Sequence, residues 1–347
     1  MTEPTFDSDR IGNFPHPRES SRLVGHAAAE RTLLQAIASG RLAHAWLFAG
    51  PQGIGKATLA YRFARFLLRF GAPVGEPRPS LDVDPDDPVS RRVAALSHGN
   101  LLVLRRPWKP GEKKPKTVVT VGEVRRVQNF FALAAGEEGW RVCIIDCADD
   151  MNLSAANALL KTLEEPPGKS VLIAVSHAPG RLLPTIRSRC RRLNLKPLSD
   201  DEVRLVLRLS APRLKAKTLD RLVPLAGGSP GKALQLAELD GVALYDEIAG
   251  LLAELPALRE RAIFRLGDRL ARPGVDRSYL VALDLLADQV RALALERLAE
   301  NGRDAAGRWA EAWEDLQRLM NVADGLNLGP KQTLYQAFCR LEEAARE

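Results

Sequence analysis

Residues 50–58, which read Gly-Pro-Gln-Gly-Ile-Gly-Lys-Ala-Thr, constrain the fold of this chain more than any other stretch. The apolar run 45–49 before them predicts a buried strand, and the spacing of apolar residues in 59–68 predicts a helix after them. A glycine loop between a strand and a helix is the arrangement of a P-loop, whose backbone N–H groups and helix N-terminus surround a phosphate. The sequence therefore predicts an α/β domain built around a phosphate-binding loop.

The loop departs from the P-loop pattern at one position. Lys56 stands where it would reach the β- and γ-phosphates, but the next residue, which should carry a hydroxyl for Mg²⁺, is Ala57. Either Thr58 supplies the hydroxyl from the neighbouring position, or the loop is a phosphate cradle without its metal ligand. Binding of ATP or ADP without hydrolysis stays open. The loop residues predicted to contact a nucleotide are Gly50, Gly53, Gly55, Lys56 and Thr58.

Length and composition limit the protein class. A chain of 347 residues with 46% hydrophobic and 27% charged residues is typical of a soluble protein of two or three domains. It has no apolar run near the roughly 20 residues that span a bilayer and no signal-peptide core, so we expect a cytoplasmic protein without a membrane partner. The net charge of +7 permits a nucleic-acid partner but indicates it only weakly.

The cysteines argue against a metal module. Cys143, Cys147, Cys190 and Cys339 form no CxxC pair, so we expect reduced thiols, no zinc and no other metal site. Residues 71–100, rich in Pro, Gly and Asp, should form an excursion from the sheet that folds without metal or stays loose.

Strand and helix patterns alternate up to residue 198 and predict a parallel sheet with helices on both faces. Composition then changes, and the expected order is a flexible segment (1–20), the P-loop α/β domain (21–198), a small helical domain (199–242) and an all-α C-terminal domain (243–347). The breaks expected within the last domain lie near Pro256, Pro273, Gly302 and Gly329.

The strand predicted at 141–146 ends in Asp146, a position from which an acid can hold Mg²⁺. The next residue is Cys147, which cannot act as a base near neutral pH unless its pKa is unusually low. Asp149 and Asp150 follow, and we expect them to cap a helix.

Two basic stretches leave alternatives open. Residues 105–116 hold six basic residues against one acid, and this loop either is solvated or contacts DNA phosphates. Arg189, in Ser188-Arg189-Cys190 at the end of a predicted helix, either is a surface arginine in a basic run or stabilises charge on a phosphate held by a neighbouring subunit.

Residues 157–167, Asn-Ala-Leu-Leu-Lys-Thr-Leu-Glu-Glu-Pro-Pro, together with 188–190 resemble the signature of bacterial sliding-clamp loaders. Those are AAA+ subunits of the DNA polymerase III holoenzyme. Weaker likenesses occur at 44–48, 121–127 and 227–234. The resemblance implies an AAA+ P-loop domain, followed by a helical lid and an all-α collar that joins subunits.

The departures from the family pattern resemble its stator subunit. Motor subunits carry Ser or Thr after the P-loop lysine, Glu after the strand-end Asp, four zinc cysteines and an arginine in the sensor-2 helix. This chain has Ala57, Cys147, no cysteine in 71–100, and Gly231 or Lys232 near the sensor-2 position. A stator hydrolyses nothing and supplies an arginine to a neighbour's ATP site.

The resemblance then implies site residues and partners. It makes Arg189 an arginine finger acting in trans, and Ser176 the sensor-1 residue of a degenerate nucleotide site that includes Asp146. Implied partners are motor (gamma/tau) and delta subunits in a hetero-oligomeric ring, the sliding beta clamp and primed DNA, in a nucleoid-associated replisome. The chain would belong to a DNA polymerase holoenzyme without polymerase or ATPase activity of its own.

Two other functions are weighed against the stator. An active AAA+ motor subunit (gamma/tau-like) would need both Thr58 and an acid near Asp149 to restore the site. A small-molecule P-loop kinase would leave the helical C-terminus and residues 188–190 unexplained.

Overall fold

The computed structural model describes residues 10–107, 116, 118–132, 138–271, 278–301, 303–326 and 328–346. Contacts within the chain divide it into two units. The first comprises Met1–Leu214 with Ala226–Leu234, and the second comprises Lys215–Leu225 with Gln235–Glu347. The boundaries expected at residues 198 and 242 stay predictions.

The first unit is organised on a five-stranded parallel sheet in the order β2-β3-β4-β1-β5. The strands are β1 (Ala45–Ala49), β2 (Leu101–Leu104), β3 (Arg141–Asp146), β4 (Ser170–Ser176) and β5 (Arg191–Asn194). Ala49 pairs with Ser176, and Asp146 pairs with Val175, so three strands end side by side. This shared edge brings the P-loop next to the ends of β3 and β4.

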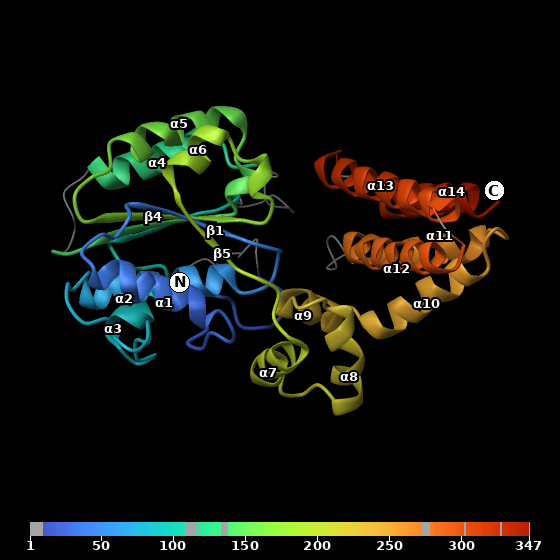
Figure 1. The fold of residues 1–347 in the computed structure, drawn as a ribbon, viewed down its shortest axis with the longest axis horizontal. Helices are drawn as coiled ribbons and strands as arrows, with labels where there is room; N and C mark the ends of the chain where they lie inside the picture. Colours follow the sequence, from blue (N-terminus) through green and yellow to red (C-terminus); the bar gives the residue numbers. More distant parts are fainter. Residues whose placement is uncertain are drawn as a thin grey trace, which may run out of the picture. The chain divides into compact units, whose positions relative to one another are not determined.

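Helices cover both faces of the sheet, as a parallel sheet requires. Figure 1 shows α1 (Ala27–Ala38), α2 (Lys56–Phe70) and α3 (Pro88–Ala94) on one face. On the other face lie α4 (Val121–Ala132), α5 (Leu153–Glu164) and α6 (Pro184–Arg189). Buried residues of α4, α5 and α6 form one apolar core with β1, β3 and β4. This is the predicted α/β domain, a parallel sheet with helices on both faces.

One strand was not predicted. Residues 187–192 carry four arginines and have no strand pattern, yet Arg191–Asn194 forms the edge strand β5 beside β1. Leu193 alone among the four strand residues is buried, and the others face solvent. The burial of one side chain in four is too weak a periodic signal to indicate a strand.

The segment expected to be flexible differs from the prediction over residues 10–20. His16 and Arg18 are buried, and the Arg18 Nε–H donates to the Ala94 carbonyl over 2.9 Å. Arg65 of α2 donates to the Ser20 carbonyl over 3.0 Å. Residues 1–9, the rest of the predicted flexible segment, lie outside the described residues.

The excursion at 71–100 is folded. Its helix α3 begins with Asp87 as N-cap, whose carboxylate accepts from the Val89 N–H over 2.8 Å. Leu81 and Val93 are fully buried, so apolar burial holds this segment against the domain.

Helices make up the rest of the described chain. The first unit also contains α7 (Asp200–Ser210), which begins with a capping box formed by Ser199 and Glu202. The further helices are α8 (Ala216–Leu225), α9 (Pro230–Glu238), α10 (Gly241–Ala253), α11 (Glu260–Leu270), α12 (Ser278–Asn301), α13 (Arg303–Leu326) and α14 (Pro330–Arg346). Within the second unit α12 packs on α13, and α11 packs on α14. The predicted all-helical C-terminal region is confirmed over the residues described.

No helix in the described part of the chain has both the length and the apolar character that crossing a membrane requires.

Candidate functional site

The glycines of residues 50–58 fix the shape of the loop. Gly50, Gly53 and Gly55 have φ values of +152°, +75° and +106°. Residues with a Cβ rarely adopt such angles, so glycine is required for the turn from β1 into α2. The loop between strand and helix therefore has the backbone that the sequence predicted.

The loop is held by the segment that starts α9. The Ser229 hydroxyl donates to the Gln52 carbonyl over 2.8 Å, and the Gly231 N–H donates to the Gly53 carbonyl over 2.9 Å. A Cβ on Gly53 would lie 2.4 Å from Ser229 Oγ, and one on Gly231 would lie 2.7 Å from Gly53 Cα. The two backbones thus meet at glycines that no larger residue can replace without a shift.

Lys56 is turned onto its own loop. Its side chain is buried, and Nζ donates to the Gly50 carbonyl over 2.7 Å and to the Pro51 carbonyl. Burial lowers the pKa of Lys56 to about 8, although Cys147, Asp146 and Asp149 act to raise it. In this structure the Lys56 ammonium group therefore donates its hydrogen bonds to the backbone of its own loop.

The pKa of Lys56 predicts a pH dependence of stability. Between pH 8 and the ordinary lysine pKa of 10.5, the unfolded chain binds a proton at Lys56 that the folded chain does not. The free energy of unfolding should then rise with pH, by up to about 1.4 kcal/mol per pH unit. Urea denaturation of the wild type and of Lys56→Met at pH 7 and pH 9.5 measures this. Other groups titrate in both chains, so the difference between the two free energies of unfolding isolates the contribution of Lys56. A pH-independent difference between the two chains would contradict the buried-lysine assignment.

Asp149 does not cap a helix, and the expectation for it was wrong. Its carboxylate accepts from the Ser176 hydroxyl over 2.7 Å, from the His177 N–H over 2.5 Å and from the Cys147 thiol over 2.8 Å. Burial acts to raise the pKa of Asp149, but these three hydrogen bonds hold it below its usual value. Asp149 therefore ties the end of β3 to the end of β4, and the N-cap of α5 is Asn152.

The residues around the loop do not fit a hydrolytic Mg²⁺–nucleotide site. Ala57 has no hydroxyl to offer a metal. Burial, and next Asp149, raise the pKa of Cys147 strongly, so its thiol stays neutral where a base would be needed. Asp146 ends β3 near Lys56, and Thr58 lies partly exposed in the first turn of α2.

Arg189 lies apart from this cluster. Its helix α6 is on the face of the sheet opposite α2 (Figure 1). Nη2 lies 2.7 Å from Glu164 Oε1, and Nη1 donates to the Thr185 carbonyl over 3.1 Å. The side chains of Arg189 and Glu164 are 37% and 49% exposed, so both are reachable by another molecule. Motifs 157–167 and 188–190 thus meet in one exposed ion pair.

The Glu164–Arg189 pair should contribute little to stability, because an exposed ion pair is screened by water. We expect Glu164→Gln to lower the free energy of unfolding by less than about 1 kcal/mol. Urea denaturation measures this, and Glu343→Gln, which removes the exposed 3.3 Å pair with Arg340, is the matched control. A loss several-fold larger than that of the control would show that the pair holds the fold.

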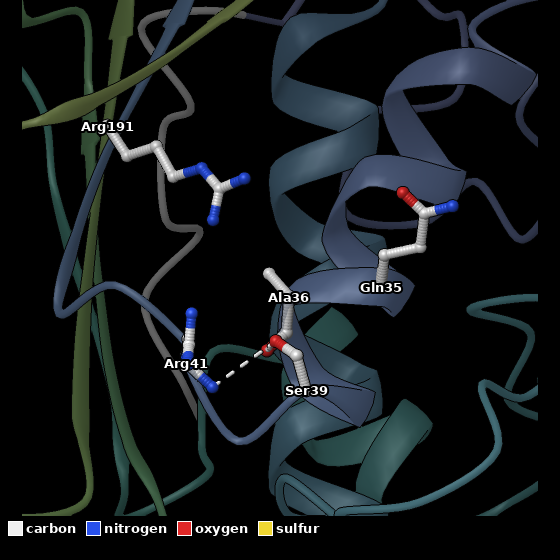
Figure 2. Close-up of a pocket in the computed structure, with 5 residues that line it drawn as sticks. All are labelled: Gln35, Ala36, Ser39, Arg41 and Arg191. Atoms are coloured by element: carbon white, nitrogen blue, oxygen red, sulfur yellow. Dashed lines mark hydrogen bonds between the residues drawn. The ribbon is translucent and has the colours of Figure 1, made fainter.

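A hollow of about 570 Å³ lies elsewhere on the first unit, between the end of α1 and β5 (Figure 2). Figure 2 shows Arg191 extending from β5 toward the helix end that carries Gln35 and Ser39. The Arg191 guanidinium lies 4.9 Å from the centroid of Trp46. Arg191 and Arg189 of the same basic run thus have different surroundings, and the hollow is lined by none of the predicted site residues.

The basic loop at 105–116 is described only in part. Arg106 Nε lies 3.2 Å from Asp150 Oδ2, which ties the start of the loop to the turn after β3. Residues 108–115 lie outside the described residues, and contact of this loop with DNA stays a prediction.

The family model described as "DNA polymerase III, delta subunit" matches residues 25–199. DNA polymerase III subunit delta' of Bacillus subtilis is 30% identical over 274 residues, which cover 75% of this chain and 77% of that protein. The chain belongs to this family, the delta' subunits of DNA polymerase III.

Other relatives agree with this membership. Subunit delta' of Pseudomonas aeruginosa is 39% identical over 200 residues, 56% of each chain. Subunit gamma/tau of Mycobacterium tuberculosis is 27% identical over 353 residues, 95% of this chain and 54% of that protein. The chain thus spans about half the length of these two relatives, so delta' membership is a statement about the family and not about a whole-protein activity.

Proposed function

We propose that this chain is the non-hydrolysing stator of a DNA polymerase III clamp loader and gives Arg189 to the ATP site of a neighbouring subunit. One observation carries the proposal: the chain's own P-loop lacks the groups for hydrolysis, while Arg189 is exposed on the other face of the sheet. The loader to which it contributes would place the sliding beta clamp on primed DNA.

The losses at the chain's own site occur at separate steps of hydrolysis. Ala57 removes a Mg²⁺ ligand, and Cys147 offers a neutral thiol at the position of the base. Lys56 donates to carbonyls of its own loop. Restoring activity would require each of these positions to be compensated, which argues against a motor ATPase in spite of the gamma/tau likeness.

Arg189 has the chemistry of an arginine finger. A guanidinium is always charged and presents a planar set of donors that matches phosphate oxygens. In this chain the donors are taken by Glu164 and Thr185 at the surface, where a neighbour's phosphate would compete with them for the guanidinium. Such an arginine stabilises the charge that develops during phosphoryl transfer.

The proposed partners follow from the family. They are motor (gamma/tau) and delta subunits in a hetero-oligomeric ring, with the helices of residues 243–347 as the collar that joins them. The beta clamp and primed DNA are reached through the complex, in the cytoplasm at the replisome. A motor subunit's ATP is the nucleotide on which Arg189 would act.

Reconstitution tests this function. The purified chain is mixed with gamma/tau and delta subunits, and assembly, ATPase activity and clamp loading on primed DNA are measured. We expect a stable complex whose ATPase needs this chain, and no turnover by the chain alone with or without primed DNA. Turnover by the isolated chain that disappears in Lys56→Ala would instead establish a motor subunit.

A further inference from the structure

Three side chains with different metal-binding atoms converge beside the P-loop. The Cys147 sulfur, a carboxylate oxygen of Asp149 and a ring nitrogen of His177 all lie within 4.8 Å of one another. Cys147 and Asp149 follow β3, and His177 follows β4, so the adjacent strand ends bring them together. Cys147 is buried, and the other two residues are half-buried.

We propose that Cys147, Asp149 and His177 form a binding site for one divalent transition-metal ion of the zinc class. Thiolate, imidazole and carboxylate are the three ligand types that zinc takes in proteins. Three protein ligands leave one position of a tetrahedral ion for water, which the partial exposure of His177 and Asp149 allows.

The imidazole of His177 has a coordination position to offer. Its Nδ1 is buried and has no hydrogen-bond partner within the described part of the chain. Buried polar atoms without a partner are uncommon in native proteins, because leaving such an atom unpaired is unfavourable. A metal ion bound at this nitrogen would give it the partner that the described residues do not supply.

The ligands are also oriented by their neighbours. The Ser176 hydroxyl holds Asp149 Oδ1 at 2.7 Å, which directs Oδ2 toward the Cys147 sulfur 2.8 Å away. Such outer-shell hydrogen bonds fix the direction of metal ligands. On binding, the metal replaces the thiol proton, which leaves to solvent, and a sulfur–metal bond forms in place of the S–H bond.

The charges around the cluster permit a dication. The carboxylates of Asp149 and Asp150 act on Cys147, and the positive charges of Lys56 and Arg106 act on His177. The positive charge of Lys56 lies beside the cluster and should oppose the binding of a metal cation there. Replacing it by methionine should therefore tighten metal binding.

Titration of the tag-free full chain with Co²⁺ and then Zn²⁺ tests the site. We expect one equivalent of Co²⁺ with a thiolate-to-cobalt charge-transfer band, displaced by Zn²⁺, and a Zn²⁺-dependent rise in Tm. Cys147→Ser should abolish the band, and His177→Asn should weaken binding by more than the roughly 10–100-fold expected for Ser176→Ala. Cys339→Ser, in α14, is the matched control and should bind as the wild type does.

Two outcomes would overturn the site. One is a wild-type chain that shows neither the charge-transfer band nor a Zn²⁺-dependent Tm shift. The other is a band that persists in Cys147→Ser or that disappears in Cys339→Ser. Circular dichroism of each variant confirms that it is folded before titration, and Ser176→Ala, which keeps all three ligands, supplies a milder variant if Cys147→Ser is unfolded. This experiment tests the metal site independently of the stator role, because no loader subunit takes part in the measurement.

Discussion

Arg189→Ala should lower the ATPase rate of a reconstituted loader by about 10³–10⁵-fold at the neighbouring site, if the arginine acts there as a full finger. The guanidinium would contact developing charge on a phosphate that this chain does not hold, so the loss falls on catalysis by the neighbour. Arg189 is exposed, and its partners among the described residues are Glu164 and the Thr185 carbonyl, so the variant should fold and assemble. Steady-state ATPase and single-turnover hydrolysis measure the effect.

The control variants lie in the same basic run. Arg187→Ala removes an exposed arginine of α6 two residues away and should leave the ATPase rate unchanged. Arg189→Lys keeps the charge but loses the planar set of donors, so its rate should fall between those of the wild type and Arg189→Ala. Equal rates for Arg189→Ala and Arg187→Ala in assembled loaders would remove Arg189 from the mechanism.

Strands of the sheet were predictable where burial is continuous. The runs 45–49 and 141–146 were predicted with the bounds that the structure has, because the residues inside them are apolar and buried. Edge strand β5 was not predicted, because Leu193 is its one buried residue and the neighbouring Arg192 and Asn194 are exposed. The fold of residues 10–20 was not predicted for a related reason. The side chains of His16 and Arg18 are buried, but a polar composition predicts an exposed segment.

The parts of the candidate site that could be predicted are those formed by residues close together in the sequence. The glycines at 50, 53 and 55 and the acid at the end of β3 follow from motif spacing. The role of Asp149 does not, because its partners Ser176 and His177 lie on another strand end. The sequence favoured a helix cap for Asp149, whereas hydrogen bonds from the end of β4 orient its carboxylate.

Contacts between distant motifs also needed the structure. Glu164 and Arg189 stand in separate signatures, and only packing of α5 against α6 pairs them. The fit of residues 229–231 onto the P-loop was missed too, although Gly53 and Gly231 were the local signal for it. A glycine required by a contact and one required by a turn look alike in a single sequence.

Gly53→Ala should lower the free energy of unfolding by about 2–6 kcal/mol, the second large effect that we expect. The φ of +75° costs roughly 1–3 kcal/mol for a residue with a Cβ. The new methyl would also lie 2.4 Å from Ser229 Oγ, and relieving such overlap costs roughly 1–3 kcal/mol more. Urea denaturation of the isolated chain measures the loss, and Gly99→Ala, whose Cβ would meet no atom within 4 Å, is the matched control.

The same variant decides why the loop is kept in a chain that does not hydrolyse ATP. If the loop serves as a structural turn seated on residues 229–231, Gly53→Ala destabilises the chain equally with and without ATP, and Gly231→Ala, whose Cβ would lie 2.7 Å from Gly53 Cα, does the same. If the loop is kept for a nucleotide, added ATP raises the Tm of the wild type, and Gly53→Ala loses that shift. Lys56 donates to a carbonyl of its own loop, and Ala57 has no hydroxyl, so we expect the first result. The P-loop would then be kept without hydrolysis because the first crossover of the sheet is built on it.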